Sequence, residues 1–280
     1  MINHQEFLNK LQKAIKENRV VLPTLPEVAL RVRDAVGKPN ASAKEISSII
    51  ITDPALSARL LQVANSPLYR GRMEVDSVQM AVMRLGNNLV RTLVSSLAMK
   101  QIFQATSDAL DRRFRASWQQ SVSVAALSHF LAQSNRHLDA DQAMLGGLIH
   151  NIGALPIFVM AENDPSLTDN PLVLNQLVDF LGPLVGCMIL DAWRFPETLK
   201  AVVTHCRNLA YESPVSKADY ADVVLVARLQ SLIGSGHPDA DADWTQVPSF
   251  AKVGMEPEVV VMEMEGAAKD VQEIRGMLGG

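Results

Sequence analysis

The stretch that decides the fold class is NNLVRTLVSSLAMKQIF, residues 87–103 of a 280-residue chain. Apolar residues recur there every three or four positions, as at Leu89, Leu93 and Leu97, which places them on one face of an α-helix. The same period returns along most of the chain, and no segment shows the clear apolar–polar alternation of a strand. The sequence therefore predicts an all-α protein, folded as a compact bundle of many helices.

The composition is that of a folded protein with no overall attraction for polyanions. Apolar residues make up 48% of the chain and charged residues 20%, which excludes disorder as its main state. A net charge of −4 provides no basic field to hold nucleic acid or an anionic membrane. Cys187 and Cys206 are too few for a disulfide framework or a four-cysteine zinc site. We therefore expect a reducing compartment, with no nucleic-acid and no membrane partner.

One uncharged stretch has the length of a membrane span but the composition of a protein core. Residues 142–161 contain no Asp, Glu, Lys or Arg, which is long enough to cross a bilayer. They also contain Gln142, His150, Asn151 and Pro156, so we interpret the stretch as buried core. The first twenty residues lack the apolar core of a signal peptide. The expected location is the cytoplasm.

Breaks in the helical pattern divide the chain into parts. Residues 1–19 are expected to form an N-terminal helix. A polar segment at 106–113 separates an N-lobe of about residues 20–106 from a C-lobe of about residues 114–235. Residues 236–280 are expected to be a loop followed by an amphipathic helix.

The C-terminal helix carries an apolar seam with heptad-like spacing. We expect it to open at Pro257. The seam consists of Val260, Met264, Ala267, Val271, Ile274 and Leu278. Because the run is shorter than three heptads, it is compatible with a helix that docks on its own bundle or with a homodimer contact.

Six short segments punctuate the helices, and each has a local structural interpretation. They are LPTLPE at 22–27, DPAL at 53–56, NSPLY at 65–69, Leu85-Gly86, GGLIHNIG at 146–153 and WRFP at 193–196. Asp53 can cap a helix that Pro54 begins, and Ser42 with Glu45 has the spacing of a capping box. Asn65 can close a helix in the left-handed conformation. Turn and capping chemistry therefore accounts for these residues.

In this order and spacing, the segments resemble the HDOD family, a bacterial signalling module related to the HD-domain metal phosphohydrolases. The resemblance covers about residues 20–235 and implies a two-lobed HD-like helical domain. In HD enzymes a histidine, an adjacent His-Asp pair and a distant aspartate hold a divalent ion, which makes hydroxide from water. Gln120, His150-Asn151 and Arg228 stand at those positions here. The resemblance thus implies a degenerate site, with no metal, no cofactor and no catalytic residue.

Two histidines leave alternatives open. His150 is either a relic ligand or a core histidine that hydrogen-bonds a neighbouring group, and Gln120 and Asn151 could join it in a neutral network that replaces a metal. His205 and Cys206 invite a metal interpretation, but adjacent side chains on a helix face different ways. A metal site would also need further ligands.

Three functions compete at this stage. The first is a non-catalytic signalling module that binds a protein partner or a small regulator, with candidate contacts at Tyr69, Arg70, Arg72, His150, His205 and Arg228. The second is a metal phosphohydrolase with an atypical site, which would draw its ligands from Asp179, Asp191, Asp219 and Asp222. The third is a nucleotide-binding sensor without turnover, in which Arg228 contacts a phosphate. The first is the expected function.

Overall fold

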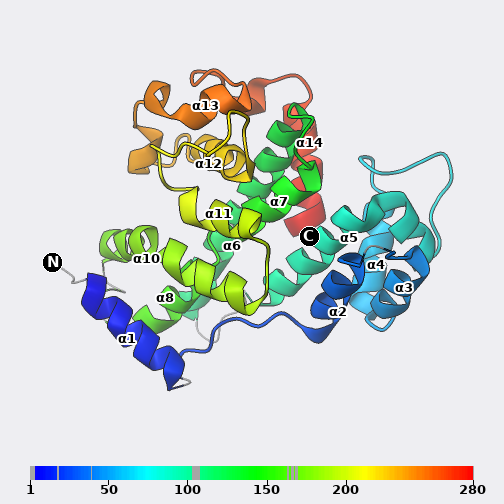
Figure 1. The fold of residues 1–280 in the computed structure, drawn as a ribbon, viewed down its shortest axis with the longest axis horizontal. Coiled ribbons are helices and arrows are strands. Elements are labelled where there is room, and N and C mark those ends of the chain that lie inside the picture. Colours follow the sequence, from blue (N-terminus) through cyan, green and yellow to red (C-terminus); the bar gives the residue numbers. More distant parts are fainter. Residues whose placement is uncertain are drawn as a thin grey trace.

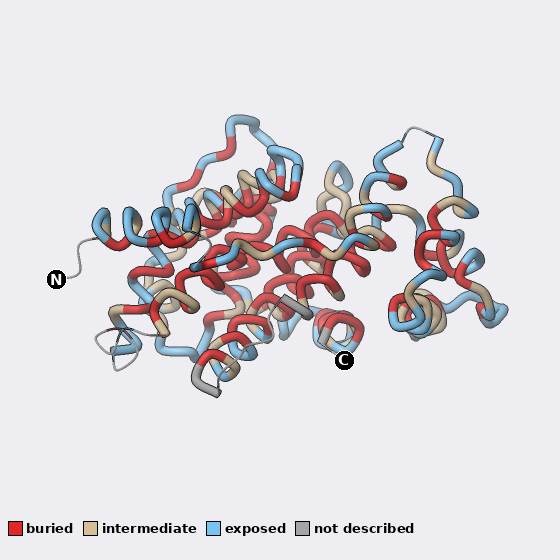
Figure 2. Tube along the Cα trace, turned by 90° about the horizontal axis from the view of Figure 1, so that it is seen from below, coloured by how far each residue is buried: buried red, intermediate tan, exposed pale blue. Residues whose placement is uncertain are grey.

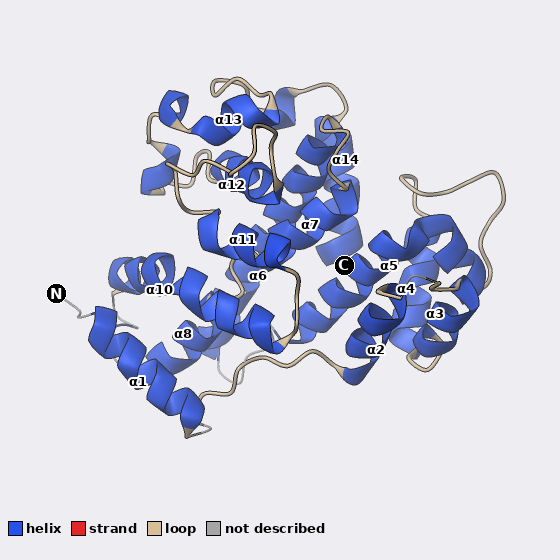
Figure 3. Cartoon of the chain, viewed as in Figure 1, coloured by secondary structure: helices blue, strands red, loops and turns tan. Residues whose placement is uncertain are grey.

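Two groups of helices are joined by the long helix α5, as Figure 1 shows. The computed structural model describes residues 4–279, apart from 18, 39, 103–107, 163, 165–166 and 168–169. This part of the chain consists of helices and loops, without a strand (Figure 3). The predicted all-α class is confirmed.

The N-lobe packs three short helices against the first part of a long one. They are α2 (Glu27–Val36), α3 (Ala43–Ile50), α4 (Pro54–Ala64) and α5 (Val78–Ile102). The predicted start signals are present, since Ser42 accepts a hydrogen bond from the Glu45 amide and Asp53 accepts from the amides of Ala55 and Leu56. Local capping chemistry therefore sets these helix boundaries.

Two backbone features of the N-lobe differ from what the sequence pattern predicts. Asn65 ends α4 with φ −101°, not in the left-handed conformation that we expected. Its side chain instead pairs with the backbone of Val75, donating to the carbonyl at 2.8 Å and accepting from the amide at 2.9 Å. Further on, α5 changes direction at Gly86, whose φ of 76° is readily adopted only by glycine.

The C-lobe is built around α6 and α7. Its helices are α6 (Asp108–Gln133), α7 (Ala140–Ile149), α8 (Ala154–Ala161), α10 (Pro171–Ala192), α11 (Glu197–His205) and α12 (Tyr220–Ser231). The C-terminal segment adds α13 (Pro248–Val253), which packs on α12, and α14 (Ala267–Gly279), which packs on α6. Residues 106–107 of the expected polar boundary lie outside the described residues, while 108–113 form the first turns of α6. An added Cβ at Gly147 would lie 2.5 Å from Ala125 Cα, so a glycine is needed where α7 crosses α6. This close crossing brings Gln120 on α6 near the residues that follow α7.

Two apolar segments pass a length and composition test for crossing a membrane. They are Ala140–Ala161, which is 89% buried inside the protein, and Pro171–Ala192, which is 44% buried. The first corresponds to α7 and α8 and contains the 142–161 stretch that we interpreted as core. Figure 2 shows that buried residues gather in the interior of the protein, and the 89% burial of this segment confirms the interpretation as core.

The C-terminal tail differs from the expected continuous helix. A 3₁₀ turn forms at Val261–Glu263, and α14 begins only at Ala267. Ala267, Val271 and Ile274 are fully buried, and α14 packs on α6 and α5 of its own chain. The expectation of a helix from Pro257 is wrong. A homodimer through this helix stays a prediction, and it would have to use the exposed side of α14.

Hydrogen bonds between sequence-distant motifs hold the two lobes together. The indole of Trp193 donates to the Pro23 carbonyl at 2.8 Å, and Arg33 donates to the Trp193 carbonyl. Trp193 itself is buried and packs edge-on against Phe195. The first helix, α1 (His4–Lys16), lies against α10 and α8. The LPTLPE and WRFP segments thus contribute to the contact between the two lobes.

Candidate functional site

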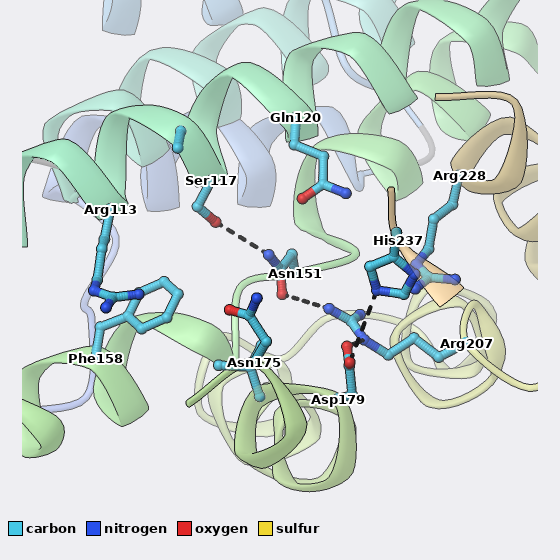
Figure 4. A pocket seen from close by; sticks show the side chains of 12 residues that line it. Arg113, Ser117, Gln120, Asn151, Phe158, Asn175, Asp179, Arg207, Arg228 and His237 are labelled. Carbon is cyan, nitrogen blue, oxygen red and sulfur yellow. Dashed lines mark hydrogen bonds and ion pairs between the residues drawn. The ribbon is translucent and has the colours of Figure 1, made fainter. Parts of the chain in front are cut away.

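A cavity of about 220 Å³ opens in the C-lobe between α6, α10 and α12 (Figure 4). Its lining residues are Arg113, Ala116, Ser117, Gln120, Asn151, Phe158, Asn175, Val178, Asp179, Arg207, Arg228 and His237. Three of the residues that the sequence placed at HD ligand positions, Gln120, Asn151 and Arg228, therefore share one cavity. The tertiary fold brings them together from α6, the turn after α7, and α12.

Asn151 lies at the centre of a polar network, as Figure 4 shows. Its amide nitrogen donates to Ser117 Oγ at 3.1 Å, and its amide oxygen accepts from Arg207 Nη2 at 2.9 Å. Arg207 Nε in turn donates to Asp179 Oδ1 at 3.0 Å. The Nε2 atom of His237 lies 3.9 Å from the other Asp179 oxygen. Asn151 is therefore held as a neutral hydrogen-bonding group whose oxygen already faces a cation.

Arg228, which the sequence predicts at an HD ligand position, brings a positive charge to the cavity. Its side chain is 2% exposed, and Nη1 lies 2.7 Å from Asp239 Oδ2. The approach is an ion pair without hydrogen-bond geometry, so no described residue accepts a hydrogen bond from Nη1. A guanidinium cannot lose its proton in a protein, so it repels a divalent cation.

His150 is not placed to act as a metal ligand in the cavity. Its side chain is buried, is not part of the cavity wall, and hydrogen-bonds through Nδ1 to the Gly147 carbonyl at 2.7 Å. Because a carbonyl only accepts, Nδ1 carries the proton, and the Nε2 atom has no partner among the described residues. Burial, followed by the charge of Arg207, lowers the pKa of His150 to about 3. The ring is therefore a neutral core group at physiological pH.

The residues proposed as alternative metal ligands lie apart and have structural partners. His205 stacks on Tyr211 at a centroid distance of 4.4 Å, while Cys206 is fully buried with a thiol pKa raised by burial. Asp219 and Asp222 form a reciprocal capping box at the start of α12. In the described part of the chain, no three His, Cys, Asp or Glu side chains converge as a metal site would require.

Two further aspartates and the N-lobe loop complete the set of predicted residues. Asp191 is ion-paired with Lys200 at 2.7 Å, whereas Asp179 lines the cavity. Tyr69 is half-buried and does not line that cavity; burial is the main cause that raises its phenol pKa. Arg70 and Arg72 are exposed on the same N-lobe loop. This loop and the cavity are therefore separate candidate surfaces.

Sequence reasoning missed several residues that line the cavity. Arg113, Ser117 and Gln120 follow one another at spacings of four and three, which places them on one face of α6. That spacing was a signal that could have found them once Gln120 was singled out. Arg207 and His237 lie in loops and had no periodic signal.

Comparison with known proteins identifies the family. The family model for the HDOD domain matches residues 22–209. The chain belongs to the HDOD family. This confirms the resemblance that the motifs carried, and it places the cavity partly beyond the matched region, since Arg228 and His237 follow residue 209.

Three solved or curated relatives add detail. A candidate metal-dependent phosphohydrolase from Shewanella amazonensis SB2B is 28% identical, with a TM-score of 0.82, covering 99% of this chain and 100% of that one. A candidate signal transduction protein from Marinobacter aquaeolei VT8 shares the fold at 23% identity and a TM-score of 0.65, covering 100% of this chain and 67% of that one. An uncharacterized protein from Treponema pallidum is 24% identical over 80% of this chain. The chain spans about half, 46%, of that relative.

The residues present do not fit the metal that HD enzymes use. A divalent ion needs carboxylates and neutral imidazoles, and the three predicted ligand positions on this wall hold two amides, Gln120 and Asn151, and the buried Arg228 guanidinium instead. The single lining carboxylate, Asp179, is already paired with Arg207. No catalytic step through a metal is therefore derived for this cavity.

Proposed function

We propose that this HDOD protein is a non-catalytic signalling module that works by binding a protein partner or a small regulator. The observation that carries the proposal is the buried Arg228 guanidinium in one cavity with Gln120 and Asn151. A protonated guanidinium at a few ångströms from a divalent ion costs several kcal/mol in a partly buried site. A domain without a metal ion in this cavity can still act by binding other molecules.

Two features support a binding role for the cavity. It is open enough to admit solvent-sized groups, at about 220 Å³, and its polar side chains are already ordered by hydrogen bonds through Asn151. Pre-ordered polar walls lower the cost of fixing a ligand. A cytoplasmic location and a protein partner stay predictions.

The test is metal content combined with turnover. The purified chain is incubated with manganese or iron(II), dialysed, and analysed for bound metal. It is then assayed with bis(p-nitrophenyl) phosphate in the presence of manganese. We expect well under one ion per chain and no turnover above the buffer rate, because the cavity wall offers a single carboxylate, which is already paired with Arg207.

The opposite result would establish the alternative. One or two retained ions per chain, together with hydrolysis that a chelator abolishes, would make the protein a metal phosphohydrolase with an atypical site. Metal retention in an Asp179→Asn variant would then show whether the lining carboxylate belongs to that site. The wild-type chain serves as its matched comparison.

A further inference from the structure

The charges around the cavity leave one arginine without a carboxylate. Arg207 is paired with Asp179 at 3.0 Å and Arg228 with Asp239 at 2.7 Å. Arg113 also lines the cavity, and its guanidinium lies 6.0 Å from the centre of the Phe158 ring. The described ion pairs include none for Arg113. Over the three arginines and their two carboxylate partners, the site has an excess of one positive charge.

The hydrogen bonds of the two paired arginines do not use all of their donors. The hydrogen bonds of Arg207 use Nε and Nη2, and Arg228 Nη1 donates to no described acceptor. The Asn151 oxygen and one Asp179 oxygen are already occupied by Arg207. Figure 4 shows Arg207 and Arg228 on the same side of the cavity, with Gln120 facing them across the gap. Two guanidinium groups that line one cavity can match the oxygens of a phosphoryl group.

The buried His150 is also influenced by the positive charges of the two paired arginines. Besides burial, the charges of Arg207 and Arg228 both lower its pKa. An anion in the cavity would interact favourably with both guanidinium charges.

A wider groove continues from the cavity and has a different character. Its volume is about 640 Å³, and it shares Gln120, Asn175, Asp179 and His237 with the cavity. The other polar residues on its wall are uncharged amides and hydroxyls: Gln119, Ser123, Gln176, Ser231 and Ser235. Such a wall can hydrogen-bond a neutral group that carries several hydroxyls.

We propose that the cavity and the groove together bind the phosphate ester of a hydroxyl-rich small molecule. The phosphoryl group lies between Arg207 and Arg228, and the hydroxyl-bearing part extends past Gln120 into the groove. The inference rests on the proposed function, because the Arg228 guanidinium that would hold the phosphoryl group is also the reason for expecting no metal. The ligand is bound and not hydrolysed.

The test is isothermal titration calorimetry of the full chain with inorganic phosphate, ribose and ribose 5-phosphate. We expect phosphate to bind, ribose 5-phosphate to bind at least about tenfold more tightly, and ribose alone not to bind. Arg207→Gln should weaken both phosphate-bearing probes by about tenfold or more, since it removes a charged donor. Arg113→Gln removes only the longer-range charge and should have a smaller effect. Arg112→Gln, an exposed arginine one position along α6, is the matched control and should bind as the wild type does.

Thermal melting shows whether each variant folds. If Arg207→Gln does not fold, the comparison of Arg113→Gln with Arg112→Gln still tests the inference. Absence of phosphate binding, or equal loss in Arg112→Gln and Arg113→Gln, would overturn the inference. If no probe binds and no metal is retained, the ligand class is wrong while the non-catalytic function stands. If metal is retained and bis(p-nitrophenyl) phosphate is hydrolysed, the proposed function itself fails.

Discussion

Replacing Gly147 with alanine tests the close crossing of α6 and α7 that assembles the cavity. The added Cβ would lie 2.5 Å from Ala125 Cα and 2.7 Å from the Ala125 nitrogen, against ordinary contacts of 3.4–4 Å. Both neighbours are backbone atoms, so no side chain can rotate away. The two helices must separate by about 1 Å, which forfeits a quarter to a half of the dispersion energy at each affected contact. We expect the free energy of unfolding to fall by about 3 kcal/mol, at the upper end of overpacking effects.

Urea unfolding followed by tryptophan fluorescence measures this change. The matched control is Gly276→Ala in α14, where an added Cβ meets no heavy atom within 4 Å. That variant should gain up to about 1 kcal/mol, because alanine favours the helix over glycine. A loss below about 1 kcal/mol for Gly147→Ala, at unchanged m-value, would refute the reasoning that the backbone crossing is rigid.

The remaining predictions concern single side chains. The folded pKa of His150, about 3, lies below its usual 6.5, so its contribution is fully present above pH 6.5 and is lost as pH falls towards 3. From pH 7 to pH 5 it should cost about 2 kcal/mol of unfolding free energy, and His150→Gln should remove this part of the pH dependence measured by urea unfolding. Asn65→Ala removes both hydrogen bonds to Val75, so limited proteolysis should cut the loop at residues 66–74 faster. An unchanged cleavage rate would show that these two hydrogen bonds do not hold the loop in place. Trp193→Phe loses the hydrogen bond to Pro23 and should lower the thermal midpoint by an amount equivalent to about 1 kcal/mol; no shift would show that the bond adds nothing.

The local chemistry of the N-lobe was readable from the sequence because its causes are local. Ser42 and Asp53 cap the helices where their spacing predicted, since a cap involves only the next two or three residues. The sequence placed Asn65 correctly at a helix end, but the left-handed conformation that it predicted there is wrong. Its partner, Val75, is ten residues away, and nothing in the sequence pattern indicates such a pairing.

The same contrast holds in the tail and at the site. The seam at Ala267, Val271 and Ile274 was correct as an apolar face, yet only the packing against α6 shows what that face covers. Gln120 and Asn151 were found through the motif positions of a family. Arg207, which donates to Asn151, lies outside any periodic pattern and was missed.

By itself, the sequence determined the helical class, most helix starts in the N-lobe and the family, while the replaced HD ligand positions stay a prediction. Those properties depend on periodicity, capping and residue identity, which can be recognised from residues within one or two helical turns of each other. Only the tertiary structure decided that Gln120, Asn151 and Arg228 share a cavity, and that Arg207 and Arg113 add positive charge to it. The physical reason is that charge and donor count in a cavity sum over side chains from distant helices, and their proximity depends on backbone crossings such as that at Gly147.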